Sequence, residues 1–111
     1  MSILIVEDEP LIGLDMAAEF EAAGIDVIGP ARDVESALEL IVDDLPTFAS
    51  LDLGTGTSLT VGEYLTDMGV PCVFVTGRAC EIAEQANKLG IRVFSKPASV
   101  QSVLDYFGYR H

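Results

Sequence analysis

Four short, largely apolar runs in this chain each end at a polar residue. The runs cover residues 3–6, 48–51, 73–75 and 93–95, and they lead in turn into Glu7 and Asp8, Asp52, Thr76 and Lys96. If the runs are parallel strands, their carboxyl ends meet at one edge of one sheet. The pattern therefore predicts three carboxylates, a hydroxyl and an ammonium group in one place.

Segments with helical spacing separate the strand-like runs. Gly24, Gly69 and Gly90 follow three of these segments, as glycine commonly follows a helix, and Asp33 is placed to cap the second one. We expect a further strand at residues 25–28, and a loop at residues 54–60, which are rich in glycine and hydroxyl side chains. The apolar positions that mark the five helices are Ile12, Met16, Phe20 and Ala23; Val34, Ala37, Leu38, Ile41 and Val42; Val61, Tyr64, Leu65 and Met68; Ile82, Ala86 and Leu89; and Val100, Val103, Leu104 and Phe107.

Five strands alternating with five helices predict an α/β domain with a parallel sheet. Right-handed crossovers place helices on both faces of such a sheet, and burial on both faces explains why the strands are continuous apolar runs. The 111 residues, half of them hydrophobic, suffice for one domain with a sizeable core. We expect a single domain over residues 1–111, with no output domain in this chain.

The composition argues against several classes of function. A net charge of -12 at pH 7 argues against nucleic-acid binding. The apolar runs are too short to cross a bilayer, and the N-terminus shows no secretory signal pattern, so we expect a cytoplasmic protein. Cys72 and Cys80 form neither a disulfide framework nor a zinc-ligand set.

The predicted cluster of polar residues suits a metal ion and a phosphoryl group. With strand order 2-1-3-4-5, the strands that end at Glu7 and Asp52 flank the crevice where open α/β sheets bind ligands. Carboxylates held together stay ionised only when a cation lies among them. Lys96 supplies one charge, and oxygen ligands without His or Cys suit Mg²⁺. An aspartate beside such a metal can act as a nucleophile and form an acyl phosphate.

The chain resembles a bacterial two-component response-regulator receiver domain over essentially its whole length. Each matching element alone is weak, whereas all four in order at the ends of four strands form a specific signature. The resemblance implies a flavodoxin-like, doubly wound (βα)5 fold with a five-stranded parallel sheet of order 2-1-3-4-5. The matching elements are Glu7-Asp8, Asp52, Thr76-Gly77 and Lys96-Pro97.

The resemblance also implies a role for each of these residues. Asp52 would be the phosphoacceptor, Thr76 would hydrogen-bond one phosphoryl oxygen, and Lys96 would pair with another. The Lys96-Pro97 bond is commonly cis in this family. The implied Mg²⁺ ligands are Glu7, Asp8, Asp52 and the backbone carbonyl of Gly54, with one of the acidic pair acting through water.

A receiver is a signalling module and not a metabolic enzyme. It would accept a phosphoryl group from a phosphohistidine on a sensor histidine kinase or phosphotransfer protein, and would catalyse its own phosphorylation and dephosphorylation. It would then switch the binding of a downstream protein, or act as a phosphate sink or relay carrier. By analogy, the partner surface would comprise the fourth helix, fifth strand and fifth helix. We expect a monomer or weak dimer, with no nucleic-acid partner and no membrane insertion.

The sequence departs from the commonest receivers at the position of the switch. These receivers carry an aromatic residue three positions before the lysine, where this chain has Val93. The segment 71–78 resembles instead a single-domain receiver class with a Phe-Ala-Thr-Gly-Tyr motif, with Val75 at the alanine and Arg78 at the tyrosine. This resemblance implies a switch in residues 77–89, whose order would change on phosphorylation.

Several alternatives compete with this interpretation. A pseudo-receiver would use the same fold for protein interaction without phosphorylation. A hydrolase of the haloacid-dehalogenase type would need an acid two residues after Asp52, where the chain has Gly54, and a flavodoxin-like cofactor carrier would need a glycine-rich loop after the first strand. Each site residue also has a simpler explanation when it is taken alone. The acidic pair could favour the start of a helix, and Asp52 could form a turn. Thr76 could be an ordinary strand residue, and Lys96 an ordinary surface residue.

Overall fold

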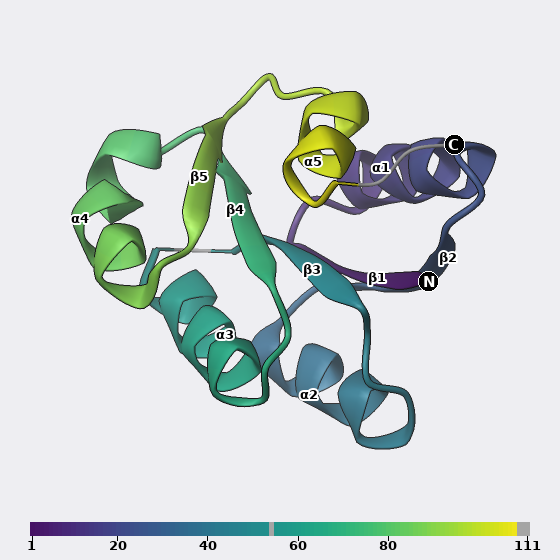
Figure 1. Ribbon diagram of the computed structural model, residues 1–111, viewed down its shortest axis with the longest axis horizontal. Coiled ribbons are helices and arrows are strands. Elements are labelled where there is room, and N and C mark those ends of the chain that lie inside the picture. The colour runs from purple at the N-terminus through teal and green to yellow at the C-terminus, as the bar shows by residue number, and fades with distance from the viewer. Residues whose placement is uncertain (54, 109–111) are drawn as a thin grey trace.

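The computed structural model describes residues 1–53 and 55–108 and confirms the predicted α/β architecture. A five-stranded parallel sheet has the order β2-β1-β3-β4-β5 (Figure 1). Within the described ranges, no helix is long and apolar enough to cross a membrane. The elements are β1 (Ser2–Glu7), α1 (Pro10–Ala22), β2 (Asp26–Ala31), α2 (Val34–Asp43), β3 (Phe48–Asp52), α3 (Thr55–Asp67), β4 (Cys72–Thr76), α4 (Ala79–Leu89), β5 (Arg92–Ser95) and α5 (Val100–Tyr106).

Helices cover both faces of the sheet, as the continuous apolar strands predict. Figure 1 shows α1 and α5 on one face and α2, α3 and α4 on the other. Alternate residues of β1 face opposite ways, so that Ile3 and Ile5 pack with α1 and α5, while Leu4 and Val6 pack with the other three helices. Each fully buried side chain of this size contributes about 1.5–3 kcal/mol, and together they fix the sheet between its two helical layers.

Side-chain caps and a left-handed glycine set several helix ends. The Asp33 carboxylate accepts a hydrogen bond from the Ser36 N–H at 2.8 Å, which confirms the predicted cap of α2. The Ser99 hydroxyl accepts from the Ser102 N–H at 3.1 Å and caps α5 in the same way. Gly90 ends α4 with φ at 74°, a conformation that glycine adopts without steric cost.

The outer edge strand β2 is irregular. It extends to Ala31, beyond the predicted residues 25–28, and its pairing with β1 shifts register between Leu4 and Val6. Gly29 in this stretch has φ at 97°, and a Cβ there would lie 2.9 Å from the Ile5 carbonyl oxygen. Pro30 follows and has no N–H to donate. The backbone at this edge therefore requires glycine at position 29.

The prediction of a loop at residues 54–60 is wrong for residues 55–60, because α3 begins at Thr55. Glycine, serine and threonine are poor helix formers, but tertiary contacts override propensity. Ser58 is buried, and Leu59 packs against the core. The segment is therefore held in a helix by contacts that its composition does not reveal.

Three residues predicted on apolar helix faces are exposed instead. Val42, next to the buried Ile41 in α2, is 81% exposed. Tyr64 of α3 is also exposed beside the buried Leu65, and so is Met68, which lies in the turn after α3. Val42 and Tyr64 each lie one residue from the buried stripe, and one residue is a rotation of about 100° around a helix. The stripes that face the sheet are thus narrower than predicted.

The contrast between Ile41 and Val42 allows a direct test of the packing. We expect Ile41→Ala to lower the free energy of unfolding by about 2–4 kcal/mol, because it leaves a cavity in the core. Val42→Ala should change it by less than about 0.5 kcal/mol. Urea denaturation followed by circular dichroism measures both, and equal losses would contradict the observed orientation of α2.

Candidate functional site

The carboxyl ends of β1, β3, β4 and β5 meet at one edge of the sheet. Glu7 pairs in register with Asp52, and Thr76 pairs with Ser95, the residue before Lys96. A cavity of about 330 Å³ opens at this edge. Its lining residues are Asp8, Glu9, Ile12, Asp52, Leu53, Thr76, Gly77, Arg78 and Lys96. The structure thus brings four of the predicted site residues to one cavity: Asp8, Asp52, Thr76 and Lys96.

Lys96 joins two of the strand-end carboxylates. Its Nζ atom donates to Glu7 Oε1 at 3.0 Å and forms an ion pair with Asp52 Oδ2. Burial alone would lower the pKa of Lys96, but the hydrogen bonds to Asp52 and Glu7 outweigh burial and raise it. The backbone holds the residue as well, because the Lys96 N–H donates to the Thr76 carbonyl at 2.9 Å. The Lys96-Pro97 peptide bond is cis.

Glu7 lies beneath the cavity and does not line it. The residue is only 2% exposed; one carboxylate oxygen faces Lys96, and the other accepts from the Glu9 N–H at 3.1 Å. Burial raises the pKa of Glu7 to about 7, against the opposing effect of its hydrogen bonds to Lys96 and the Glu9 N–H, and the nearby charge of Asp52 raises it further. Both oxygens of Glu7 are therefore engaged with protein groups.

The predicted metal ligands divide into different positions. Asp8 is exposed and lines the cavity with Asp52, and the Asp8 N–H donates to the Asp52 carbonyl at 3.3 Å. Gly54, whose carbonyl is predicted as a ligand, lies outside the described residues. Among the residues that the structure describes, no group of three acidic, His or Cys side chains is arranged to hold a metal ion. Two carboxylates at an open cavity nevertheless suit Mg²⁺, which keeps several waters and needs one or two carboxylates.

Thr76 ends β4 as a buried residue at the wall of the cavity. Its hydroxyl accepts a hydrogen bond from the Arg78 N–H at 3.0 Å. A hydroxyl that accepts a bond still has its own proton to donate. Thr76 can therefore hold the turn before α4 and donate to an oxygen in the cavity at the same time.

Two further residues of the site were not predicted as site residues. The buried Ser58 hydroxyl accepts from the Leu53 N–H at 2.7 Å, and so holds the backbone of the residue that follows Asp52. Arg78 lines the cavity from the start of α4. Neither role follows from the sequence, because Ser58 lies in a segment predicted as a loop and Arg78 follows its strand by two residues.

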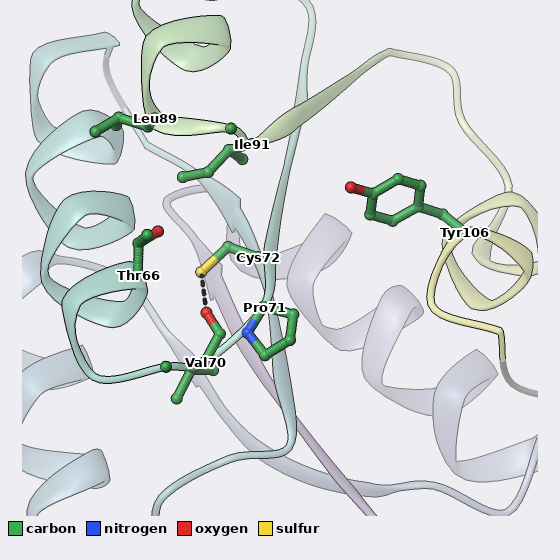
Figure 2. Close-up of a pocket in the computed structure, with 9 residues that line it drawn as sticks. Thr66, Val70, Pro71, Cys72, Leu89, Ile91 and Tyr106 are labelled. Carbon is green, nitrogen blue, oxygen red and sulfur yellow. Dashed lines mark hydrogen bonds between the residues drawn. The ribbon is translucent and has the colours of Figure 1, made fainter.

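A second cavity lies at the opposite, amino ends of β4 and β5. Figure 2 shows that it is lined largely by apolar side chains, among them Val70, Pro71 and Ile91. The Cys72 thiol donates to the Val70 carbonyl at 3.3 Å, and burial raises its pKa to about 12 (Figure 2). No carboxylate is among the described residues that line this cavity. The acidic cluster of the site thus has no counterpart among the described residues that line this cavity.

Comparison with known proteins identifies the fold. No protein-family model matches the chain. It is 37% identical over 79 residues to the phyllosphere-induced regulator PhyR of Methylorubrum extorquens, a match that covers 67% of this chain and 30% of that protein. The match thus spans less than a third of the length of this curated relative.

Two solved structures are similar over nearly the whole chain. A response regulator from Burkholderia pseudomallei, whose structure contains a phosphorylated aspartic acid, a calcium ion and citrate, has a TM-score of 0.82 and 28% identity, and the match covers 93% of this chain and 64% of that one. A CheY-like response regulator receiver domain protein from Methanospirillum hungatei has a TM-score of 0.82 and 22% identity, covering 96% and 90%. The chain therefore has the fold of a response-regulator receiver domain.

The contacts of Lys96 predict that the buried Glu7 carboxylate needs the Lys96 ammonium group to compensate its charge. We expect Lys96→Met to lower the free energy of unfolding by about 3–5 kcal/mol at pH 8, because it leaves the buried Glu7 carboxylate unpaired. Adding Glu7→Gln should recover most of that loss, since the amide carries no charge. Urea denaturation in the presence of EDTA measures both variants.

Lys88→Met is the matched control, because the Lys88 ammonium forms an ion pair with Glu84 in which both side chains are exposed. Its loss should stay below about 1 kcal/mol. A double variant at positions 7 and 96 that is no more stable than Lys96→Met alone would show that the lysine does not compensate Glu7.

Proposed function

We propose that this chain acts as a response-regulator receiver in two-component signal transduction and accepts a phosphoryl group on Asp52. The donor is a phosphohistidine of a sensor histidine kinase or phosphotransfer protein, and Mg²⁺ is the cofactor. The observation that carries the proposal is the position of Asp52. Its carboxylate pairs with Lys96 at a cavity that Asp8 and Thr76 also line.

The residues at the cavity suit an in-line phosphoryl transfer. An Asp52 carboxylate oxygen attacks the phosphorus, the bond from phosphorus to the histidine nitrogen breaks, and an acyl phosphate forms. Asp8, Asp52 and the Gly54 carbonyl would hold the cation, with Glu7 as a ligand through water. When bound, the divalent cation offsets negative charge on the phosphoryl oxygens.

Lys96 and Thr76 supply the remaining contacts to the phosphoryl group. The Lys96 ammonium can pair with one phosphoryl oxygen, and the Thr76 hydroxyl can donate to another. Glu7, with both oxygens engaged beneath the cavity, holds Lys96 in position. The aspartic acid phosphorylated in the Burkholderia pseudomallei regulator, and the calcium ion in that structure, support an acyl phosphate and a divalent cation here.

The proposed function also extends to the location, oligomeric state and downstream partner of the protein. The chain is not a metabolic enzyme, because the only group that it modifies is its own aspartate. It is cytoplasmic, acts as a monomer or weak dimer, and passes the signal by changing its affinity for a downstream protein. The similarity to PhyR, a regulator, supports a role in regulation.

The first test is phosphorylation by a small donor. We expect acetyl phosphate with Mg²⁺ to add one phosphoryl group to the intact protein, as measured by mass spectrometry. Asp52→Asn should abolish the adduct because the amide is not a nucleophile, and EDTA should abolish it by removing the cation. Asp67→Asn, which alters an exposed acid at the end of α3, is the matched control and should leave the adduct unchanged.

Either of two outcomes would contradict this proposal. An adduct that survives Asp52→Asn would mean that another residue is the nucleophile. A wild-type protein that binds Mg²⁺ but gains no phosphoryl group from the donor or from phosphohistidine proteins would favour the pseudo-receiver.

We also propose that the switch lies in residues 77–89, as in receivers with a Phe-Ala-Thr-Gly-Tyr motif. Val93 packs against the core on the α4 side and supplies no aromatic ring. Within α4 only Ile82 and Ala86 are buried, and few buried contacts favour local opening. The Thr76 hydroxyl accepts a hydrogen bond from the Arg78 N–H. A phosphoryl group that accepts a hydrogen bond from Thr76 therefore acts directly on the turn before α4.

Backbone NMR tests this location of the switch. Beryllium fluoride with Mg²⁺, a mimic of the phosphoryl group, should change the chemical shifts and line widths of residues 77–89 well beyond those of α2 and α3. Unchanged signals in residues 77–89, with changed signals at Asp52 to prove binding, would contradict it.

A further inference from the structure

The peptide group between Asp52 and Leu53 is held at both of its polar ends. Its carbonyl accepts a hydrogen bond from the Asp8 N–H at 3.3 Å, and its N–H donates to the Ser58 hydroxyl at 2.7 Å. Asp8 follows β1, whereas Ser58 belongs to α3. Because a peptide group is planar and rigid, these two segments together fix its orientation.

The two bonds lie where the sheet no longer holds β3 on both sides. β3 pairs with β1 as far as Asp52, which lies opposite Glu7. Among the described residues, its pairing with β4 ends one residue earlier, at Leu51. The backbone at Asp52 therefore depends on contacts beyond the β3–β4 ladder, and the bond from Leu53 to Ser58 is the shorter of the two that hold its peptide group.

The hydroxyl that holds Leu53 lies inside the protein. Ser58 is 2% exposed, and Leu53 is buried in the same core cluster as Val61 of α3. A buried N–H needs a partner, and here the Ser58 hydroxyl is an acceptor for it. Serine is also a poorer helix former than alanine, so position 58 gives up some helix stability for its hydroxyl group.

We infer that Ser58 is a positioning residue for phosphoryl transfer: its hydroxyl holds the peptide group after Asp52, and so sets the direction of the Asp52 carboxylate in the cavity. The inference rests on the proposed function, because it presumes that Asp52 is the phosphoacceptor. Ser58 is not among the described residues that line the cavity. It therefore acts through the backbone of Asp52 and Leu53.

The direction of the Asp52 side chain matters because the transfer needs an in-line approach. An Asp52 oxygen must approach phosphorus opposite the bond that breaks, and a small displacement of a reacting group lowers the rate steeply. The Asp52 side chain is only 15% exposed and is paired with Lys96. Rotation of the side chain thus has little room to correct a shift of the backbone.

The first measurement needs neither a phosphoryl donor nor a metal ion. NMR spectroscopy of the whole chain in EDTA follows the Leu53 amide and the carboxyl carbon of Asp52. We expect Ser58→Ala to speed hydrogen exchange of the Leu53 amide about tenfold and to shift the Asp52 carboxyl signal. Ser58→Thr, which keeps the hydroxyl, should leave both close to wild type.

The second measurement is the second-order rate constant for phosphorylation by acetyl phosphate with Mg²⁺, followed by intact mass. In this reaction a bond forms from an Asp52 oxygen to phosphorus, the bond from phosphorus to the acetate oxygen breaks, and acetate leaves with the electron pair. We expect Ser58→Ala to lower the rate constant about tenfold to a hundredfold. Ser58→Thr should retain most of the wild-type rate.

Thr47→Val is the matched control, because it removes a bond of the same kind at the other end of the same strands. The Thr47 hydroxyl accepts from the Ser2 N–H at 3.0 Å, at the amino ends of β1 and β3. Its loss should leave the Asp52 carboxyl signal and the rate constant unchanged. If Ser58→Ala does not fold, Ser58→Cys takes its place, since a thiol is similar in shape but a weak acceptor.

The outcomes separate this inference from the proposed function. A wild-type rate constant in Ser58→Ala, or equal losses of rate in Ser58→Ala and Thr47→Val, would overturn the positioning role. An Asp52 carboxyl signal that does not move in Ser58→Ala would overturn it too. If the wild type gains no phosphoryl group from acetyl phosphate or phosphohistidine proteins, the proposed function fails and the inference about transfer fails with it. A shifted Asp52 signal in Ser58→Ala would then show a carboxylate that Ser58 orients but that does not react.

Discussion

The parallel register of β1 and β3 places Glu7 directly opposite Asp52. The arrangement of the rest of the site depends on that pairing. Two carboxylates at adjacent strand ends, one of them buried, repel each other unless a cation lies between them. Lys96 reaches both from the loop after β5. One ammonium group thus ties together three strands that are far apart in sequence, and it does so at the edge where the sheet binds ligands.

The ion pairs also define separate tasks for the two residues of the acidic pair. Glu7 points beneath the cavity, where its oxygens hold Lys96 and the Glu9 N–H, whereas Asp8 lines the cavity. Adjacent residues at the end of a strand face opposite ways, so one acid can be structural while its neighbour stays accessible. The cavity at the amino ends of β4 and β5 is, by contrast, lined largely by apolar side chains.

Sequence patterns predicted the parts of this structure that depend on periodicity and local chemistry. The five strands, the two helical layers and the Asp33 cap follow from apolar spacing and from capping rules. The strand order, which the structure confirms, was implied by the resemblance to receiver domains. The helical start of α3 did not follow from these patterns, because its glycine and hydroxyl residues are typical of a loop, and the burial of Ser58 and its bond from the Leu53 N–H cannot be seen in the composition. Arg78 was missed as a cavity residue because its position depends on the hydrogen bond from its N–H to the Thr76 hydroxyl, which no sequence pattern indicates. The roles assigned to the site residues stay predictions.

The irregular edge at β2 limits what the sheet can join. An unpaired strand edge offers N–H and C=O groups to any other extended chain, and so invites aggregation. Here Pro30 removes a donor, and the register shift beside Gly29 interrupts the regular spacing of the others. A strand from another chain could not form a continuous ladder of hydrogen bonds along this edge. A small protein that is half hydrophobic in composition thereby carries, in two residues, a barrier to fibre growth along one side of its sheet.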